Sequence, residues 1–276
     1  MYQTIISVSE LQRNLQNPSW NILDCRFNLA DTDQGLREYH AGHIPRSHYA
    51  HLDEDLSSVV IPGVTGRHPL PELEIFAIRL RKWGITNQSQ VVAYDGGNGG
   101  IAARLWWMLR WLGHDAVAVL NGGWSAWVAS GAPQTVEISP VQYGSFQPDL
   151  RSDLAIDRKE VENVLGNKEW IVVDARAEER YLGLVEPIDP VAGHIDGAIN
   201  HPFTSNLTAE GVWKSPEELK SELDLKCKNH KANHTVFYCG SGVTACHNVL
   251  AYKHAGLGDA RLYPGSWSEW INKLQD

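Results

Sequence analysis

The chain has 276 residues, of which 33 are acidic and 24 are basic, so its net charge is −9. This balance argues against nucleic acid as a partner, because binding a phosphate backbone requires a basic face. The N-terminus shows no signal-peptide pattern, and no apolar run reaches the roughly 18 residues of a membrane-spanning helix. Four scattered cysteines without a CxxC pair predict neither a disulfide framework nor a metal site. We therefore expect a cytoplasmic protein with free thiols and no membrane partner.

The first half of the chain predicts a short helix over residues 7–15 and a strand over residues 20–24. Asp24-Cys25-Arg26 ends this strand, and a Gly-His-Ile motif follows at residues 42–44. A second apolar strand over residues 91–94 ends at Asp95, and a glycine-rich loop and a helix come after it. These short strands, each followed by a helix, predict a parallel sheet.

The second half repeats these blocks in the same order, with an offset of about 150 residues. The repeated blocks are a helix over 157–165, a strand over 170–174, Asp-Ala-Arg at 174–176, Gly-His-Ile at 193–195, a strand over 236–238 and a helix over 245–254. A tandem pair of α/β domains is therefore predicted, each a parallel sheet flanked by helices on both faces. We assign the domains to residues 1–132 and 154–276, joined by a proline-rich linker over 133–153.

Cys239 is the main candidate for chemistry, because it stands where the strand over 236–238 ends. Gly240 and Gly242 let the following backbone curl so that its N–H groups point inward. The helix that begins near Ala245 adds its positive end, and both effects favour a thiolate over a thiol. A small buried cysteine before an ordinary glycine turn is the alternative.

Taken together, these motifs resemble those of the rhodanese-like sulfurtransferases, through Asp-x-Arg, Gly-His-Ile, the cysteine loop and a terminal Gly-x-Trp-x-x-Trp block. The resemblance implies a catalytically silent N-terminal copy, since Asp95 replaces the cysteine there. The loop over 239–244 looks like that of 3-mercaptopyruvate sulfurtransferases, whereas thiosulfate-preferring members place Arg and Lys after the cysteine. This resemblance implies sulfur transfer from 3-mercaptopyruvate to a thiol or cyanide through a Cys239 persulfide, with release of pyruvate.

The resemblance also implies roles for individual residues. Ser241 matches a serine that handles protons around the substrate thiol, although a local turn role is equally open. Asp53 aligns with an acidic residue that completes this relay from the N-terminal domain, and His68 with a histidine that lines the cleft. Arg180 is expected to bind the donor's carboxylate, because a guanidinium matches a carboxylate in plane. The remaining expected substrate contacts come from the loop, at Gly240, Gly242, Val243 and Thr244.

One departure from the family pattern concerns a second arginine. Mercaptopyruvate enzymes carry one some nine residues beyond the equivalent of Arg180, but residues 186–191 contain no basic side chain. Arg26 and Arg176 occur in both copies, so we interpret them as structural partners of Asp24 and Asp174. The tryptophans at helical spacing and in the repeated blocks are expected to pack in the core.

Other functions stay open at this point. A cysteine phosphatase of this fold would need an arginine six residues after Cys239, where Ala245 stands. A non-catalytic persulfide sensor or binding module would usually lack the cysteine, and thiosulfate:cyanide transfer is the nearest alternative activity. Cys246 could be a resolving thiol or a small packing residue. We expect no metal or organic cofactor, and the acceptor could be thioredoxin or another thiol.

Overall fold

The computed structural model describes residues 1–227 and 230–274 and divides into two compact units. Unit 1 comprises Met1–Ser58, Pro71–Leu150 and Ala209–Trp213, and unit 2 comprises Val59–Leu70, Arg151–Thr208 and Lys214–Asp276. The segment Val59–Leu70 therefore belongs to the C-terminal unit, although it lies in the N-terminal half of the sequence. The domain boundaries at 132 and 154 stay predictions.

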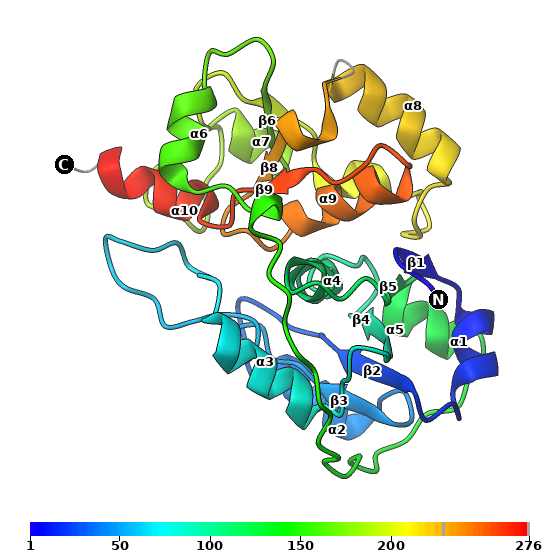
Figure 1. Cartoon of the computed structure of the whole chain (residues 1–276). Coiled ribbons are helices and arrows are strands. Elements are labelled where there is room, and N and C mark those ends of the chain that lie inside the picture. The colour runs from blue at the N-terminus through cyan, green and yellow to red at the C-terminus, as the bar shows by residue number, and fades with distance from the viewer. Residues whose placement is uncertain (228–229, 275–276) are drawn as a thin grey trace. The chain divides into compact units, whose positions relative to one another are not determined.

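Unit 1 is built on a parallel sheet with the strand order β1-β5-β4-β2-β3. Helices α1 and α5 lie on one face of this sheet, and α3 and α4 lie on the other (Figure 1). The elements are β1 (Ile5–Ile6), α1 (Val8–Asn14), β2 (Trp20–Asp24), α2 (Gln34–Ala41), β3 (Ser47–Tyr49), α3 (Leu73–Lys82), β4 (Gln90–Tyr94), α4 (Ala102–Trp111), β5 (Val117–Leu120) and α5 (Gly123–Ala129). The predicted strands over 20–24 and 91–94 are confirmed.

Unit 2 repeats this plan with the strand order β7-β6-β8-β9, again parallel. Helices α6 and α10 cover one face, and α8 and α9 cover the other (Figure 1). Its regular elements are α6 (Arg158–Val164), β6 (Ile171–Asp174), α7 (Glu178–Tyr181), β7 (Ile199–Asn200), α8 (Pro216–Cys227), β8 (Thr235–Tyr238), α9 (Ala245–His254), β9 (Arg261–Leu262) and α10 (Ser266–Trp270). Short 3-10 turns are η1 (Ser152–Leu154), η2 (Phe203–Asn206), η3 (Ala232–His234) and η4 (Ile271–Leu274).

Local sequence explains where the first helix of each copy begins. The Ser7 hydroxyl accepts a hydrogen bond from the Glu10 backbone N–H, and the Glu10 carboxylate accepts one from the Ser7 N–H. Asp157 and Glu160 make the same reciprocal pair before α6. This capping box satisfies two N–H groups that a helix start otherwise leaves without a partner.

The Asp-x-Arg motif clamps the end of a strand to the Gly-His-Ile segment. In unit 2, the Arg176 guanidinium donates to the Asp174 carboxylate at 2.6 Å and to the Gly193 carbonyl at 2.6 Å. It also lies over the ring of Trp267, with its central carbon 5.0 Å from the ring centroid. In unit 1 the same contacts are made by Arg26 with Asp24, Gly42 and Trp124. The predicted pairing of both arginines with Asp24 and Asp174 is confirmed.

Tryptophan packing is also as predicted. Four tryptophan side chains are almost completely buried, at 2% exposure or less, and they are Trp106, Trp107, Trp127 and Trp267. Trp127 lies in the apolar cluster between α1, α5 and the sheet of unit 1. Trp267 takes the corresponding place in unit 2, against strands β6 and β8. The repeated tryptophan blocks therefore serve the two cores.

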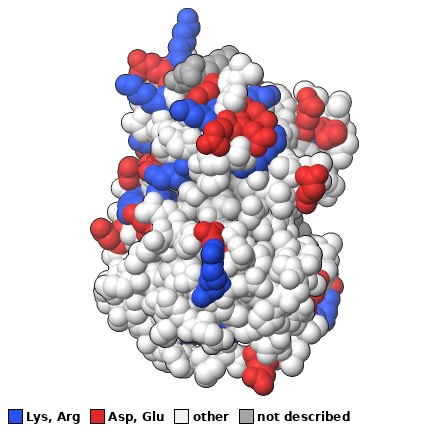
Figure 2. Space-filling view, turned by 90° about the vertical axis from the view of Figure 1, so that its right-hand side faces the viewer, with Lys and Arg blue, Asp and Glu red and all other residues white. Residues whose placement is uncertain are grey.

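Charged side chains of both signs are interspersed on the face that Figure 2 shows, and no continuous basic stripe crosses the described residues there. Helix α8 illustrates the mixture, because acidic side chains such as Glu217 and Glu218 alternate with Lys220 and Lys226. Within the part of the chain that the structure describes, no helix is both long and apolar enough to cross a membrane.

The Asp95 carboxylate occupies the centre of the loop that follows β4 in unit 1. Its carboxylate accepts hydrogen bonds from four backbone N–H groups, at 3.0 to 3.2 Å, and the side chain is buried. The donors are Gly97, Gly99, Ile101 and Ala102. A loop whose N–H groups converge in this way is an anion-binding concavity. In this copy the anion is part of the chain.

We predict that Asp95→Ala lowers the free energy of unfolding of unit 1 by about 2–3 kcal/mol, because it leaves buried N–H groups without their charged acceptor. Asp95→Asn keeps an oxygen acceptor and should lose less. Asp33→Ala is the control, since Asp33 is exposed and its side chain caps no helix N–H. Denaturant unfolding measures all three, and equal stabilities for Asp95→Ala and Asp33→Ala would contradict this account of the loop.

Candidate active site

The backbone around Cys239 is fixed by the turn that begins α10. The Cys239 N–H donates to the Ser266 hydroxyl at 3.1 Å, and the Cys239 carbonyl accepts from the Trp267 N–H at 3.0 Å. The next carbonyl, that of Gly240, accepts from the Ser268 N–H at 2.9 Å. Cys239 itself is 2% exposed. The sulfur therefore sits at the carboxyl end of β8 in a loop that is held rigidly from one side.

Gly242 is required by this arrangement. Its φ is +75°, and a methyl group at this position would lie 2.2 Å from the Pro264 carbonyl oxygen. Only glycine allows both this conformation and this approach. Further along the loop, Val243 is buried, and Thr244 is the residue from which α9 begins. Cys246, in the first turn of α9, is buried and donates its S–H to the Gly242 carbonyl at 3.3 Å.

Ser241 and His68 meet in the structure. The Ser241 hydroxyl oxygen and Nδ1 of His68 lie 2.7 Å apart, a hydrogen bond whose donor depends on the imidazole tautomer. Both side chains are buried, at 6% and 5% exposure. His68 is contributed by Val59–Leu70, which belongs to unit 2. Ser241 and His68, both predicted site residues, are therefore in direct contact, and Ser241 is the residue that follows Gly240.

Arg180 also lies beside the loop. A methyl group at position 240 would lie 3.6 Å from its Nη2 and 3.8 Å from its Nη1. However, the guanidinium is already engaged, because Nε and Nη2 donate to the two oxygens of Glu186 at 3.1 and 2.7 Å. Nη2 also donates to Asp189 at 3.2 Å. The expected substrate arginine is therefore next to the loop and held by two carboxylates.

Arg67 is a second arginine beside the loop, and sequence analysis missed it. A methyl group at position 240 would lie only 2.8 Å from its Nη2. Its Nη1 forms an ion pair with Asp189, and its backbone N–H donates to the Ser268 hydroxyl at 3.1 Å. Burial lowers the pKa of the Arg67 guanidinium, while the negative charge of the nearby Cys239 thiolate opposes this shift. The one available signal was its position directly before His68.

Residues 186–191, which contain no basic side chain, supply the two carboxylates that bind Arg180 and Arg67. Glu186 accepts from Arg180 and, at 3.2 Å, from Arg176, and the backbone N–H groups of Ile188 and Asp189 donate to it at 3.1 Å. Asp189 bridges Arg180 and Arg67. Its position is nine residues after Arg180, where the family pattern would place an arginine. The loop side chains are uncharged, as predicted, but two guanidinium groups reach the loop from elsewhere.

Asp53 belongs to unit 1, where its side chain is exposed and its backbone N–H donates to Nδ1 of His51 at 3.1 Å. Its part in a proton relay stays a prediction.

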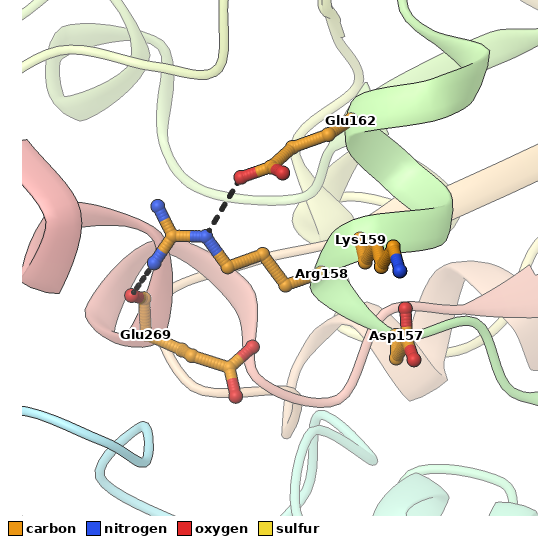
Figure 3. Close-up of a pocket in the computed structure, with 5 residues that line it drawn as sticks. All are labelled: Asp157, Arg158, Lys159, Glu162 and Glu269. Carbon is orange, nitrogen blue, oxygen red and sulfur yellow. Dashed lines mark hydrogen bonds and ion pairs between the residues drawn. The ribbon is translucent and has the colours of Figure 1, made fainter.

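A separate surface pocket contains none of the predicted site residues (Figure 3). It is lined by Asp157, Arg158, Lys159, Glu162 and Glu269. Arg158 donates to the Glu162 carboxylate and to the Glu269 carbonyl, both at 3.0 Å, so its charge stabilises α6 and α10. Among the described residues, no group of three or more His, Cys, Asp or Glu side chains is placed so that it could hold a metal ion.

A cysteine in a tight loop at the carboxyl end of a parallel strand, beside two guanidinium groups, is an arrangement that can serve a nucleophilic thiol and a small anionic ligand. Residues 7–130 and 157–273 each match the rhodanese-like domain, and the chain belongs to the rhodanese-like family. A protein from Pseudomonas aeruginosa named probable 3-mercaptopyruvate sulfurtransferase is 46% identical over 268 residues, which cover 97% of this chain and 94% of that protein.

Other relatives are named either for thiosulfate or for 3-mercaptopyruvate. The thiosulfate sulfurtransferase of Rattus norvegicus is 35% identical over 99% of this chain and 93% of its own length. Among solved structures, a 3-mercaptopyruvate sulfurtransferase from Leishmania major superposes with a TM-score of 0.85. It is 33% identical, and the match covers 99% of this chain and 75% of that chain.

Proposed function

We propose that this chain is a sulfurtransferase that moves a sulfur atom from 3-mercaptopyruvate to a thiol or to cyanide through a persulfide on Cys239. The observation that carries the proposal is the convergence of the Cys239 loop and two guanidinium groups at Gly240. A nucleophilic sulfur and a site for a carboxylate are what this donor requires. The relative from Pseudomonas aeruginosa, with a mercaptopyruvate name, supports the choice of donor.

The proposed reaction has two halves. First, the Cys239 thiolate attacks the donor's sulfur, an S–S bond forms, and the donor's C–S bond breaks so that its electron pair leaves on carbon as the enolate of pyruvate. The proton of the donor's thiol is transferred to that carbon, which gives pyruvate and a persulfide anion. In the second half, an acceptor thiolate or cyanide attacks the outer sulfur, and the bond to Cys239 breaks to restore the thiolate.

The loop of unit 1 supports a role for the backbone in this chemistry. There, four N–H groups hold the Asp95 carboxylate at the position that corresponds to Cys239. A persulfide places a charged atom two bonds from Cβ, as a carboxylate oxygen of aspartate does. We propose that the loop over 239–244 holds the outer sulfur in the same way, as preorganised dipoles stabilise developing charge in an oxyanion hole.

Ser241 and His68 are the proposed carriers of the proton in the first half-reaction. Their 2.7 Å contact permits a proton to pass between hydroxyl and imidazole, and Ser241 is two residues from Cys239 in the same loop. Asp53 is proposed to complete this relay, on the strength of the family resemblance alone.

Thiosulfate is the second candidate donor, because relatives that match nearly the whole chain carry that name. The charge of the site favours a monoanion instead. The two guanidinium groups beside the loop are balanced by the Glu186 and Asp189 carboxylates, so the cluster has no excess positive charge for a dianion. We further propose that the acceptor in the cell is a thiol such as thioredoxin. We also propose a cytoplasmic location, because four free cysteines suit a reducing compartment.

We predict that incubation with 3-mercaptopyruvate, without acceptor, adds one sulfur atom to the protein, a mass increase of about 32 Da. Cys239→Ser should abolish both the increase and turnover. Cys227→Ser is the matched control, because burial raises the pKa of that thiol to about 12 and leaves it unreactive. Intact-protein mass spectrometry measures the result, and a persistent increase in Cys239→Ser would remove Cys239 as the nucleophile.

A second prediction separates the proton relay from the nucleophile. Thiosulfate has no thiol proton to move, so Ser241→Ala should lower kcat with 3-mercaptopyruvate by about 100-fold, the low end of general acid–base effects, and change kcat with thiosulfate far less. Steady-state kinetics with both donors measures the ratio. An equal loss with the two donors would mean that Ser241 supports the loop rather than the proton transfer.

A further inference from the structure

The two arginines beside Gly240 offer different parts of their guanidinium groups to a ligand. A guanidinium binds a planar carboxylate best through two parallel N–H groups, and the side-on pair is Nε with Nη2. The ion pairs within this chain use that pair repeatedly, for example Arg26 with Asp24 and Arg176 with Asp174. The state of this pair therefore decides which arginine can take the carboxylate of a substrate.

Arg180 has its side-on pair occupied. Nε and Nη2 donate to the two oxygens of Glu186, whose side chain is only 4% exposed. Glu186 is itself fixed by two backbone N–H groups and by Arg176. A substrate carboxylate would have to displace a buried and well-bonded anion to bind Arg180 in this way.

Arg67 has the same pair open. Its Nη1 is the atom that contacts Asp189, which leaves Nε and Nη2. Nε is buried without a hydrogen-bond partner among the described residues, and Nη2 points to the position where a side chain at Gly240 would begin. A buried N–H without a partner costs free energy, which a ligand recovers when it accepts the bond. Nη2 of this open pair therefore lies beside Gly240, the residue that follows Cys239.

We propose that Arg67 makes the two-pronged contact to the donor's carboxylate and that Asp189 positions it, while Arg180 adds a flanking positive charge. This inference rests on the proposed function, since it concerns the donor of that reaction. Asp189 suits its role because it is 2% exposed and each of its oxygens contacts a different arginine, Oδ1 with Arg67 and Oδ2 with Arg180. The chain would then obtain its second substrate arginine from the segment that also carries His68.

The test compares single variants by steady-state kinetics with 3-mercaptopyruvate and by competitive inhibition with pyruvate, which shares the carboxylate. Arg67→Ala should raise KM and the inhibition constant of pyruvate by about 100-fold, the loss of a bidentate charged contact, with a smaller change in kcat. Arg67→Lys should recover little, because an ammonium is a point donor. Asp189→Asn should give an intermediate rise in KM.

Lys253→Ala is the matched control for charge removal. Lys253 is paired with Asp259 and is 26% exposed, close to the 28% of Arg67, but it lies in the last turn of α9, away from the loop. This variant should leave KM unchanged. Thermal unfolding of each variant excludes loss of the fold as the cause of a changed KM.

A pair of glycine variants tests the same inference without removing a charge. In Gly240→Ala the new methyl group would lie 2.8 Å from Nη2 of Arg67 and must displace it, so KM should rise as in Arg67→Ala. Gly96 is the equivalent residue of unit 1, since the Ser125 N–H donates to its carbonyl as the Ser268 N–H donates to that of Gly240. Nothing lies within 4 Å of a methyl group there, so Gly96→Ala should leave KM unchanged.

Failure of this inference is distinguishable from failure of the proposed function. An unchanged KM in Arg67→Ala, with active wild-type protein, would overturn the role of Arg67 and leave the sulfurtransferase standing. A large rise in KM in Arg180→Ala alone would assign the carboxylate to Arg180 instead. Absence of turnover and of the 3-mercaptopyruvate mass increase in the wild type would overturn both.

Discussion

The geometry of the candidate site depends on two backbone hydrogen bonds that hold the loop after β8 in unit 2. The Trp267 and Ser268 N–H groups donate to the carbonyls of Cys239 and Gly240, and Trp124 and Ser125 do the same for Asp95 and Gly96 in unit 1. These bonds do not involve the side chain at the head of the loop. The same backbone can therefore present a carboxylate in one copy and a sulfur atom in the other.

This independence explains how a duplicated domain can keep its fold whether a carboxylate or a thiol stands at the head of the loop. In unit 1 the Asp95 carboxylate satisfies the loop N–H groups, so the copy is stable without a ligand. In unit 2 the same position carries Cys239. Its loop is contacted by residues distant in the sequence, since His68 bonds to Ser241 and Arg67 lies beside Gly240. The Arg176 clamp and its stacking on Trp267 connect this loop to the rest of the core.

The second constraint is electrostatic, and it comes from carboxylates rather than from arginines. Glu186 and Asp189 are buried, at 4% and 2% side-chain exposure, and together they fix Arg180 and Arg67 beside Gly240. A buried carboxylate is stable only when it is paired and hydrogen-bonded, so the two anions and the two cations depend on each other. The result is a locally neutral site in which one guanidinium still has donors to offer.

Much of the fold follows from the sequence, because its signals are local. The β-branched and aromatic residues over 236–238 predicted β8, and the repeated order of blocks predicted the duplication. The helices predicted over 7–15 and 157–165 correspond to α1 and α6. Strands β1, β3, β5, β7 and β9 were missed, and three of them have only two residues, which give no periodicity. Pairing with longer neighbours forms them.

The site was less predictable, because its contacts are long-range. The sequence identified Cys239, Ser241 and His68, but Arg67 is 122 residues from Asp189, and no local pattern connects them. The segment over 186–191 was noted for what it lacks, a basic residue. The role of Glu186 and Asp189 is visible only in the fold, where they form ion pairs with Arg180 and Arg67.

Parallel steady-state kinetics with 3-mercaptopyruvate and with thiosulfate, using cyanide and then a dithiol as the acceptor, tests the central claim most directly. A kcat/KM that favours 3-mercaptopyruvate by tenfold or more, about 1.4 kcal/mol in transition-state stabilisation, is the result that a neutral, carboxylate-binding site predicts. A preference for thiosulfate would contradict it and would mean that the two guanidinium groups act on a dianion despite their carboxylate partners.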